Sequence, residues 1–263
     1  QLALSHRVRI GLSHIHLVLD GAEIKLEEPT TVTELYDHHL ESYKWIVSSG
    51  GTYLHNNDYN KVIDMACIHL YRFYNEGMLD DLVNLIFYRH RHQQPTHYLI
   101  NILYDCPKPE WLLFVARFFY STFKDQNFAR KILRFIPGVT EASTPEEALN
   151  YVEEWYDNNH DYLLFTGETY DANHAPVPFV VHYPAKYLGK AIHPLTGQFI
   201  SPLNQNDYDK RLSFSKLRIE IQELLATTSH QKRKLNRPEW KKWIKASLST
   251  HLNEHNIPVS CCH

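Results

Sequence analysis

Histidine is the residue type with the most obvious potential for chemistry, because the chain of 263 residues contains 18 of them. Three pairs stand close together in the sequence, at His14 and His16, His38 and His39, and His90 and His92. On a β-strand, His14 and His16 would share one face and could offer two imidazole ligands to Zn²⁺ or a similar ion. No HExxH motif and no paired CxxC motif accompanies them. We therefore expect most histidines to lie on surfaces and interfaces, with His14 and His16 as the candidate metal ligands.

Signatures of nucleophilic or nucleotide-dependent catalysis are absent from the sequence. There is no GxSxG, GxxxxGK[ST] or GxGxxG motif, which excludes nucleotide binding through those loops. His160 stands near the acidic residues Glu153, Glu154, Asp157 and Asp161, and such groups can act together as acid and base. A solvated acidic helix face explains the same residues. A metal-dependent enzyme with a His/acid site is therefore kept as an alternative, and no cofactor is expected.

A basic segment at 230–245 is the strongest candidate for a binding site. It contains seven Lys or Arg residues, one acidic residue and two tryptophans. Lysine and arginine neutralise phosphate groups and release counterions, and tryptophan can stack on bases. The candidate residues for binding a protein partner or a nucleic acid are Lys232, Arg233, Lys234, Arg237, Trp240, Lys241, Lys242, Trp243 and Lys245.

The two tryptophans of this segment also fit a structural role. On a helix, Trp240, Trp243, Ile244 and Leu248 fall at positions i, i+3, i+4 and i+8, which is the spacing of a buried stripe with the lysines outside it. We therefore favour docking to an acidic protein surface over binding to nucleic acid. Binding to an anionic membrane surface is a third interpretation of the same charges.

Charge is distributed unevenly along the chain, whose formal net charge is −3. Residues 1–206 carry 16 basic and 24 acidic side chains, whereas residues 207–263 carry 11 basic and 6 acidic ones. No Lys or Arg occurs between Phe135 and Ala185. Segregated charge of this kind is typical of partner surfaces. The acidic stretch 135–185 is thus a candidate partner for the basic segment, in the same chain or in another copy.

Composition predicts a globular protein of a reducing compartment. Hydrophobic residues make up 43% and charged residues 22% of the chain, which is ordinary for a soluble domain. The four cysteines, Cys67, Cys106, Cys261 and Cys262, form no disulfide framework, so we expect a cytoplasmic location. No apolar run approaches the roughly 18 residues of a membrane-spanning helix, so no transmembrane segment is expected.

The first element that the sequence predicts is a β-hairpin over residues 14–27. Two runs with alternating apolar and polar residues flank Asp20-Gly21, which is a preferred sequence for a two-residue hairpin turn. Pairing outward from the turn sets Leu19 opposite Ala22 and leaves one face wholly apolar.

Helical periodicity begins at residue 31 and continues for most of the chain. It predicts helices near 31–47, 58–76, 79–87, 95–103, 109–123, 128–135 and 145–156. Residues 161–206 lack long periodicity, and only 179–183 there is typical of a strand. A helical part from Asp207 to Leu225, a basic break, and a final helix from about 236 to 252 complete the prediction.

The predicted fold is mainly α. It is an antiparallel helical array, either a bundle or a short solenoid of helical hairpins, with an N-terminal β-hairpin and a basic helical C-terminal part. The predicted parts are an N-terminal segment (1–30), a helical core (31–160), an ordered connector rich in Tyr and Pro (161–206) and the basic C-terminal part (207–263).

The function that we expect is that of a non-catalytic helical scaffold or adaptor subunit. It would mediate contacts between proteins, or self-association into an oligomer, within a larger assembly. The absence of catalytic motifs and the segregated charge favour this interpretation. A nucleic-acid-binding protein that uses the basic segment is the first alternative, and the His/acid enzyme is the second.

Overall fold

The structure is a computed structural model, and it describes residues 78–168 and 175–258. It also describes nine single positions nearer the N-terminus: Leu40, Tyr43, Lys44, Val47, Ile63, Asp64, Ala66, Cys67 and Leu70. All nine are helical, and they fall in the segments 31–47 and 58–76 that the sequence predicts as helices. The predicted hairpin at 14–27, with His14 and His16, lies outside the described residues.

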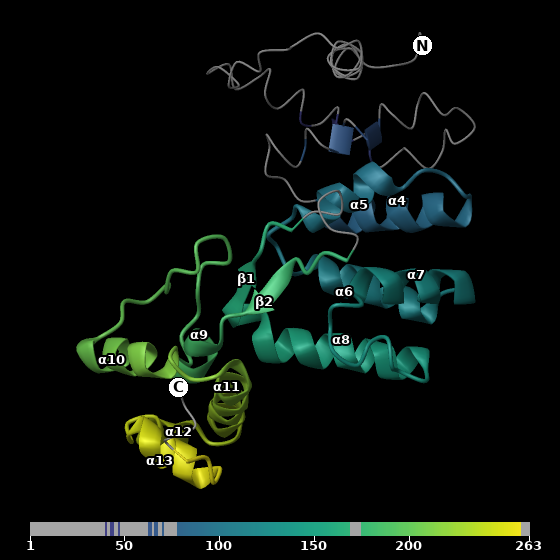
Figure 1. The fold of residues 1–263 in the computed structure, drawn as a ribbon. Coiled ribbons are helices and arrows are strands. Elements are labelled where there is room, and N and C mark those ends of the chain that lie inside the picture. The colour runs from purple at the N-terminus through teal and green to yellow at the C-terminus, as the bar shows by residue number, and fades with distance from the viewer. Residues whose placement is uncertain are drawn as a thin grey trace, which may run out of the picture. The chain divides into compact units, whose positions relative to one another are not determined.

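The described part of the chain is mainly helical, as the sequence predicts, with ten α-helices and one two-stranded antiparallel sheet (Figure 1). None of the helices in that part is long and apolar enough to cross a membrane. The chain divides into two compact units. Unit 1 contains Gln1–Cys106, Glu110–Leu149 and Glu168–Pro176, and unit 2 contains Pro107–Pro109, Asn150–Gly167 and Val177–His263.

Unit 1 is built from short helices that follow one another closely. They are α4 (Leu79–Arg91), α5 (His97–Tyr104), α6 (Trp111–Ala116), the 3-10 helix η2 (Arg117–Tyr120) and α7 (Phe123–Leu133). The predictions at 79–87 and 95–103 are thus confirmed. The predicted helix at 109–123 is wrong in its second half, because the α-helix stops at Ala116 and α7 begins at Phe123. Thr122 accounts for the new start, since its hydroxyl accepts the Asp125 N–H as an N-cap.

Aromatic stacking and one buried ion pair hold unit 1 together. The Phe87 ring lies 3.6 Å from the ring of Phe118 in a parallel stack and 5.2 Å from Phe128 edge-on. Arg89, which is fully buried, donates to the carboxylate of Asp64 at 2.6 Å. Burial outweighs this partner and raises the pKa of Asp64 to about 6. The charge of the buried Arg89 is therefore compensated by Asp64 within unit 1.

Helix α8 (Pro145–Asn159) begins as the sequence predicts. The Thr144 hydroxyl accepts the Glu147 N–H at 3.1 Å, and the Glu147 carboxylate accepts the Ser143 N–H at 2.7 Å. These two bonds resemble the capping box that the order Thr-Pro-Glu-Glu predicts. The 3-10 helix η3 (His160–Tyr162) follows directly.

Unit 2 contains the small sheet and a short helix that the sequence did not predict. Strand β1 (Leu163–Phe165) pairs antiparallel with β2 (Phe179–Val181), which confirms the predicted strand at 179–183 over three residues. Helix α9 (Tyr183–Leu188) starts at the N-cap His182, whose ring accepts the Ala185 N–H, and ends at Gly189 with a φ of +64°. Six residues are too few to show periodicity, which is why this helix escaped prediction.

Four helices form the C-terminal part of unit 2: α10 (Gln205–Phe214), α11 (Ile219–Leu235), α12 (Arg237–Trp243) and α13 (Leu248–Glu254). The predicted break over the basic residues before Asn236 is wrong, because α11 continues through them. The chain breaks at Asn236 instead, where the side chain accepts the Glu239 N–H and caps α12. The predicted single helix at 236–252 is also interrupted, since Ser247 caps α13 through the Thr250 N–H.

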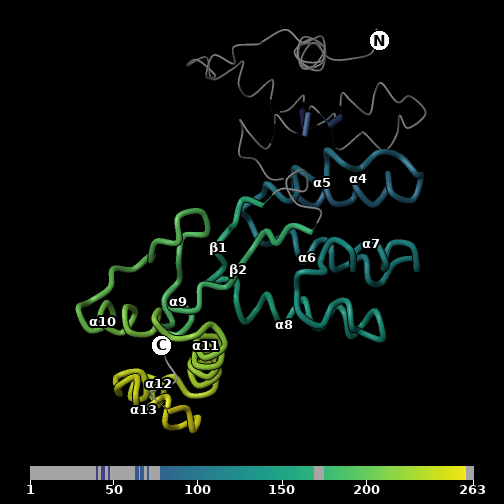
Figure 2. The backbone as a smooth tube through the Cα atoms, viewed as in Figure 1, coloured from purple at the N-terminus to yellow at the C-terminus, as the bar shows by residue number. Residues whose placement is uncertain are grey.

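The core of unit 2 lies where α11 packs against α9 and α12 (Figure 2). Its buried members are Tyr187, Leu188, Phe214, Leu217, Leu225, Ala226, Trp243 and Leu252. These residues come from α9 through α13, so the helices of the predicted connector and of the predicted C-terminal part share one core. Burial of this apolar surface is the main force that holds α11 and α12 in place.

Candidate functional site

The structure brings the nine candidate residues of the basic segment onto two consecutive helices and the turn that follows them. Three lie in the last turn of α11, five on α12, and Lys245 just after α12. Cations near a helix C-terminus interact favourably with the helix dipole. The three basic residues in the last turn of α11 therefore also have a structural role. Five of the nine are exposed, and we call them the basic surface: Lys234, Arg237, Lys241, Lys242 and Lys245.

Trp240 and Trp243 belong to the core rather than to this surface. The Trp240 indole N–H donates to the Ser229 hydroxyl at 2.9 Å, and the Trp243 indole N–H donates to the Glu254 carboxylate at 2.8 Å. Trp243 is 9% exposed, and its ring stacks on the ring of His251 at 3.7 Å. The residues of the predicted stripe do contact the core, but the helix that was to carry them is interrupted between Ile244 and Leu248, and Trp240 is only partly buried.

Arg233 and Lys232 are also engaged inside unit 2. The Arg233 guanidinium donates to the carbonyl oxygen of Gly189 at 2.9 Å and to the hydroxyl of Tyr162. It also lies over the rings of Tyr162 and Trp240. Lys232 is half-buried, 3.9 Å from Glu254, with its ammonium over the ring of Trp243. Both side chains therefore tie α11 to its neighbours.

The basic surface has no partner of opposite charge within the described residues. None of its five side chains forms an ion pair or a side-chain hydrogen bond there, although, besides burial, the charge of Lys234 contributes to lowering the pKa of His230. Ion pairs among the described residues therefore do not account for the grouping of these charges. Their positions favour contact with something outside the chain.

An acidic face of unit 2 complements this surface in charge. It consists of the exposed side chains Glu153, Glu154 and Asp157 on α8 and Asp161 on η3. No Lys or Arg of the described residues pairs with any of the four, and Asp161 has only His160 at 3.5 Å. The side chains of this group are exposed to solvent. Their geometry therefore does not support the acid–base chemistry that the sequence suggests for them.

A buried polar network, which the sequence does not predict, lies behind the basic surface. The Tyr187 hydroxyl donates to His251 Nδ1 at 2.7 Å, and His251 Nε2–H donates to the Trp243 carbonyl at 2.8 Å. The Ser229 hydroxyl donates to the Tyr187 carbonyl at 2.6 Å. Burial lowers the pKa of His251, so its ring stays neutral and accepts from Tyr187. This network fixes the positions of α12 and α13 against α9.

Two basic side chains of unit 2, Lys186 and His230, have strongly lowered pKa values. Lys186 is 5% exposed and donates to the Asn159 side-chain oxygen at 2.7 Å, and burial lowers its pKa to about 8. Burial lowers the pKa of His230 to about 4, and the charges of Lys186 and Arg233 act in the same direction. Shifts in pKa of this size are common at functional sites, and they also occur in polar clusters whose role is structural. The shift of Lys186 accompanies an interior hydrogen bond, whereas His230 Nδ1 is buried without a hydrogen-bond partner among the described residues.

The histidines of the described residues show no arrangement for binding a metal. No group of three or more His, Cys, Asp or Glu side chains in that part of the chain could hold an ion. The His90 ring stacks on Phe128 at 3.8 Å, and His92 Nδ1 is hydrogen-bonded to the Tyr88 carbonyl at 2.8 Å. The candidate ligands His14 and His16 lie outside the described residues.

The sequence matches no protein-family model, and comparisons with curated proteins and with solved structures give no match. The geometry of the basic surface and of the acidic face is therefore the basis on which a function is proposed.

Proposed function

We propose that the chain is a non-catalytic scaffold subunit whose basic surface docks onto acidic protein surfaces, above all onto the acidic face of another copy. One observation carries this proposal: two exposed surfaces of opposite charge lie in unit 2, and neither is compensated by ion pairs among the described residues. Complementary charge steers encounter and selects partners, although it adds less to affinity.

Apolar contacts must supply the remaining affinity, because ion pairs between exposed side chains contribute only about 0.2–1 kcal/mol each. Leu235 is the apolar candidate. Its side chain is 87% exposed, and it stands next to Lys234 at the end of α11. An exposed leucine inside a group of cations is typical of a docking surface in which one apolar anchor is surrounded by charge.

A contact between the basic surface of one copy and the acidic face of the next joins two different patches. Such a heterologous contact leaves one patch open at each end of a pair, so the copies add head to tail until they form a ring or an open filament. The proposal therefore predicts assembly beyond a dimer and a strong dependence on protein concentration.

Sedimentation velocity over a range of protein concentrations tests this proposal. The assembly is expected at about 0.1 M salt and should weaken at about 1 M, where the Debye length falls from roughly 10 to 3 Å. The double variant Lys241→Glu/Lys242→Glu should sediment as a smaller species at low salt. The control Lys216→Glu/Arg218→Glu makes the same change in net charge at exposed positions outside the basic surface, and it should assemble like the wild type.

Binding to nucleic acid remains the competing function, because five exposed cations on consecutive elements also suit phosphate groups. Trp243 is buried and stacked on His251, which leaves only the partly exposed Trp240 for the base-stacking contacts that single strands use. Fluorescence anisotropy with labelled single- and double-stranded DNA separates the two functions. A monomeric wild type that binds DNA with a steep salt dependence, lost in Lys241→Glu/Lys242→Glu, would replace the scaffold by a nucleic-acid-binding protein.

A further inference from the structure

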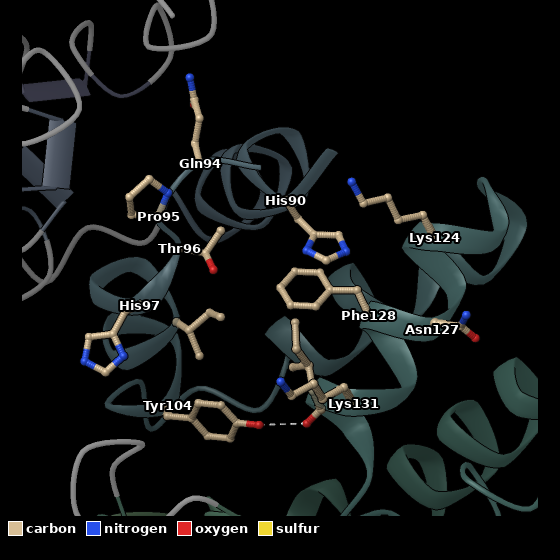
Figure 3. A pocket seen from close by; sticks show the side chains of 12 residues that line it. His90, Gln94, Pro95, Thr96, His97, Tyr104, Lys124, Asn127, Phe128 and Lys131 are labelled. Carbon is tan, nitrogen blue, oxygen red and sulfur yellow. Dashed lines mark hydrogen bonds between the residues drawn. The ribbon is translucent and has the colours of Figure 1, made fainter. Parts of the chain in front are cut away.

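A pocket of about 610 Å³ opens in unit 1 between the end of α4, the start of α5 and one face of α7 (Figure 3). Its volume lies within the range of small-molecule sites, roughly 300–1,000 Å³. On α7, the lining residues Lys124, Asn127, Phe128 and Lys131 fall at positions i, i+3, i+4 and i+7, so one helix face supplies them all. His90 projects towards this face from the last turn of α4.

The charge of this pocket is positive. Lys124 and Lys131 line it, and no Asp or Glu is among its lining residues in the described part of the chain. The acid next to Lys124 in the sequence, Asp125, is fully buried and accepts from Arg91 Nε at 2.9 Å and from the Ser121 hydroxyl at 2.5 Å. Its charge is therefore already compensated by Arg91.

The two lysines keep their charge available for a ligand. Lys124 Nζ donates to the neutral carbonyl of Arg91 at 3.2 Å, and neither lysine forms an ion pair within the described residues. Burial and the two lysines lower the pKa of His90, so its imidazole is neutral at pH 7. The pocket thus combines two cations with one neutral ring.

The inner part of the pocket is apolar. The ring of Phe128 is stacked on that of His90 at 3.8 Å with an interplanar angle of 8°, which holds both rings in place. Ile100 from α5 and Ile132 from α7 are buried beside them. In Figure 3 the stacked rings lie between Lys124 and Lys131, so that the apolar wall has a cation on either side. This arrangement suits a ligand that has an anionic head and an apolar body, because each part then finds its complement.

We propose that this pocket binds a small organic anion, a phosphate or carboxylate carried on an aromatic or aliphatic body. The exposed side chains of Lys124 and Lys131 turn over the stacked rings to hold the anionic head, and Phe128 with Ile132 contacts the body. The site lies in unit 1 and shares no residue with the basic surface. It gives the scaffold a ligand-binding function that the proposed docking does not require.

Isothermal titration calorimetry of the full chain with phenyl phosphate tests this site. Inorganic phosphate and phenol serve as probes that each lack one half of the ligand. We expect one phenyl phosphate per chain, with each half-probe binding at least tenfold more weakly. Lys124→Gln and Lys131→Gln should each weaken phenyl phosphate by roughly tenfold, since each removes one charge-assisted contact.

Lys216→Gln is the matched control, because it removes one exposed lysine charge that lies outside both the pocket and the basic surface. It should bind phenyl phosphate like the wild type, and circular dichroism should show all three variants folded. The proposal is overturned if phenyl phosphate does not bind at millimolar concentration. It is equally overturned if inorganic phosphate binds as tightly, or if Lys216→Gln weakens binding as much as the two pocket variants do.

Discussion

Replacing Gly189 with alanine should destabilise unit 2 strongly, because this glycine lies under two residues of the basic segment. Gly189 ends α9 with a φ of +64°, a left-handed conformation that costs an L-residue about 1–2 kcal/mol. A Cβ placed there would lie 2.8 Å from Cζ2 and 3.0 Å from Cη2 of Trp240, and 3.2 Å from Cδ of Arg233. Overpacking of this kind typically costs about 1–3 kcal/mol. The expected total is about 2–5 kcal/mol.

Gly167→Ala is the matched control for this prediction. Gly167 also lies in unit 2 and has a φ of +72°, but a Cβ there would meet nothing within 4 Å. Its substitution should cost only the conformational strain, about 1–2 kcal/mol. The difference between the two variants therefore isolates the packing of Trp240 and Arg233 against Gly189.

Urea unfolding of the full chain, followed by tryptophan fluorescence and far-UV circular dichroism, measures both variants. With a urea dependence of about 2 kcal/mol per M, Gly189→Ala should lower the midpoint by about 1–2.5 M and Gly167→Ala by about 0.5–1 M. Equal shifts for the two variants would refute the reasoning, because they would mean that Trp240 does not pack on Gly189 in solution. Trp240 would then be available as a binding residue.

Three further predictions concern the interior of unit 2. Tyr187→Phe removes the hydroxyl that donates to His251 at 2.7 Å, and thermal unfolding should show a loss of about 1–3 kcal/mol; no change would mean that the network is not formed. Lys210→Met removes the donor to the carbonyls of Ile244 and Ala246, and it should cost about 1.5–3 kcal/mol in urea unfolding. The pKa of His230 is lowered from 6.5 to about 4, so the unfolded chain binds the proton more tightly, and the free energy of unfolding should rise with pH between 4 and 6.5. Urea titrations across this pH range should show a flatter rise for His230→Gln, and an unchanged slope would contradict the assignment.

Helices whose starts and faces are set locally could be predicted from the sequence. Helix α8 is an example, because Thr144 and Glu147 are three residues apart and cap it regardless of the rest of the fold. The C-terminal end of α11 is the opposite case. Arg233 there bonds to Gly189, 44 residues away, and to Tyr162, 71 residues away. The charges alone predict a break, and only these distant contacts explain the helix.

The candidate site was predictable to a similar extent. The spacing of Trp240 and Trp243 places them on the core side of a helix, as the structure confirms. The periodicity of α11 does not show that Arg233 lies against the core, since its partners come from other elements. In the pocket of unit 1, the spacing of Lys124 and Lys131 around Phe128 is visible in the sequence, whereas the walls from α4 and α5 are not.

A mixing experiment with two charge-reversed variants tests the proposed scaffold function most directly. Lys241→Glu/Lys242→Glu reverses the charge of two of the five residues of the basic surface, and Glu153→Lys/Glu154→Lys reverses two of the four residues of the acidic face. Each variant alone should sediment as a smaller species than the wild type at low salt. Their equimolar mixture should form a mixed complex, because the reversed acidic face of one variant complements the reversed basic surface of the other. A mixture that sediments as the sum of its two separate components would contradict the proposed contact.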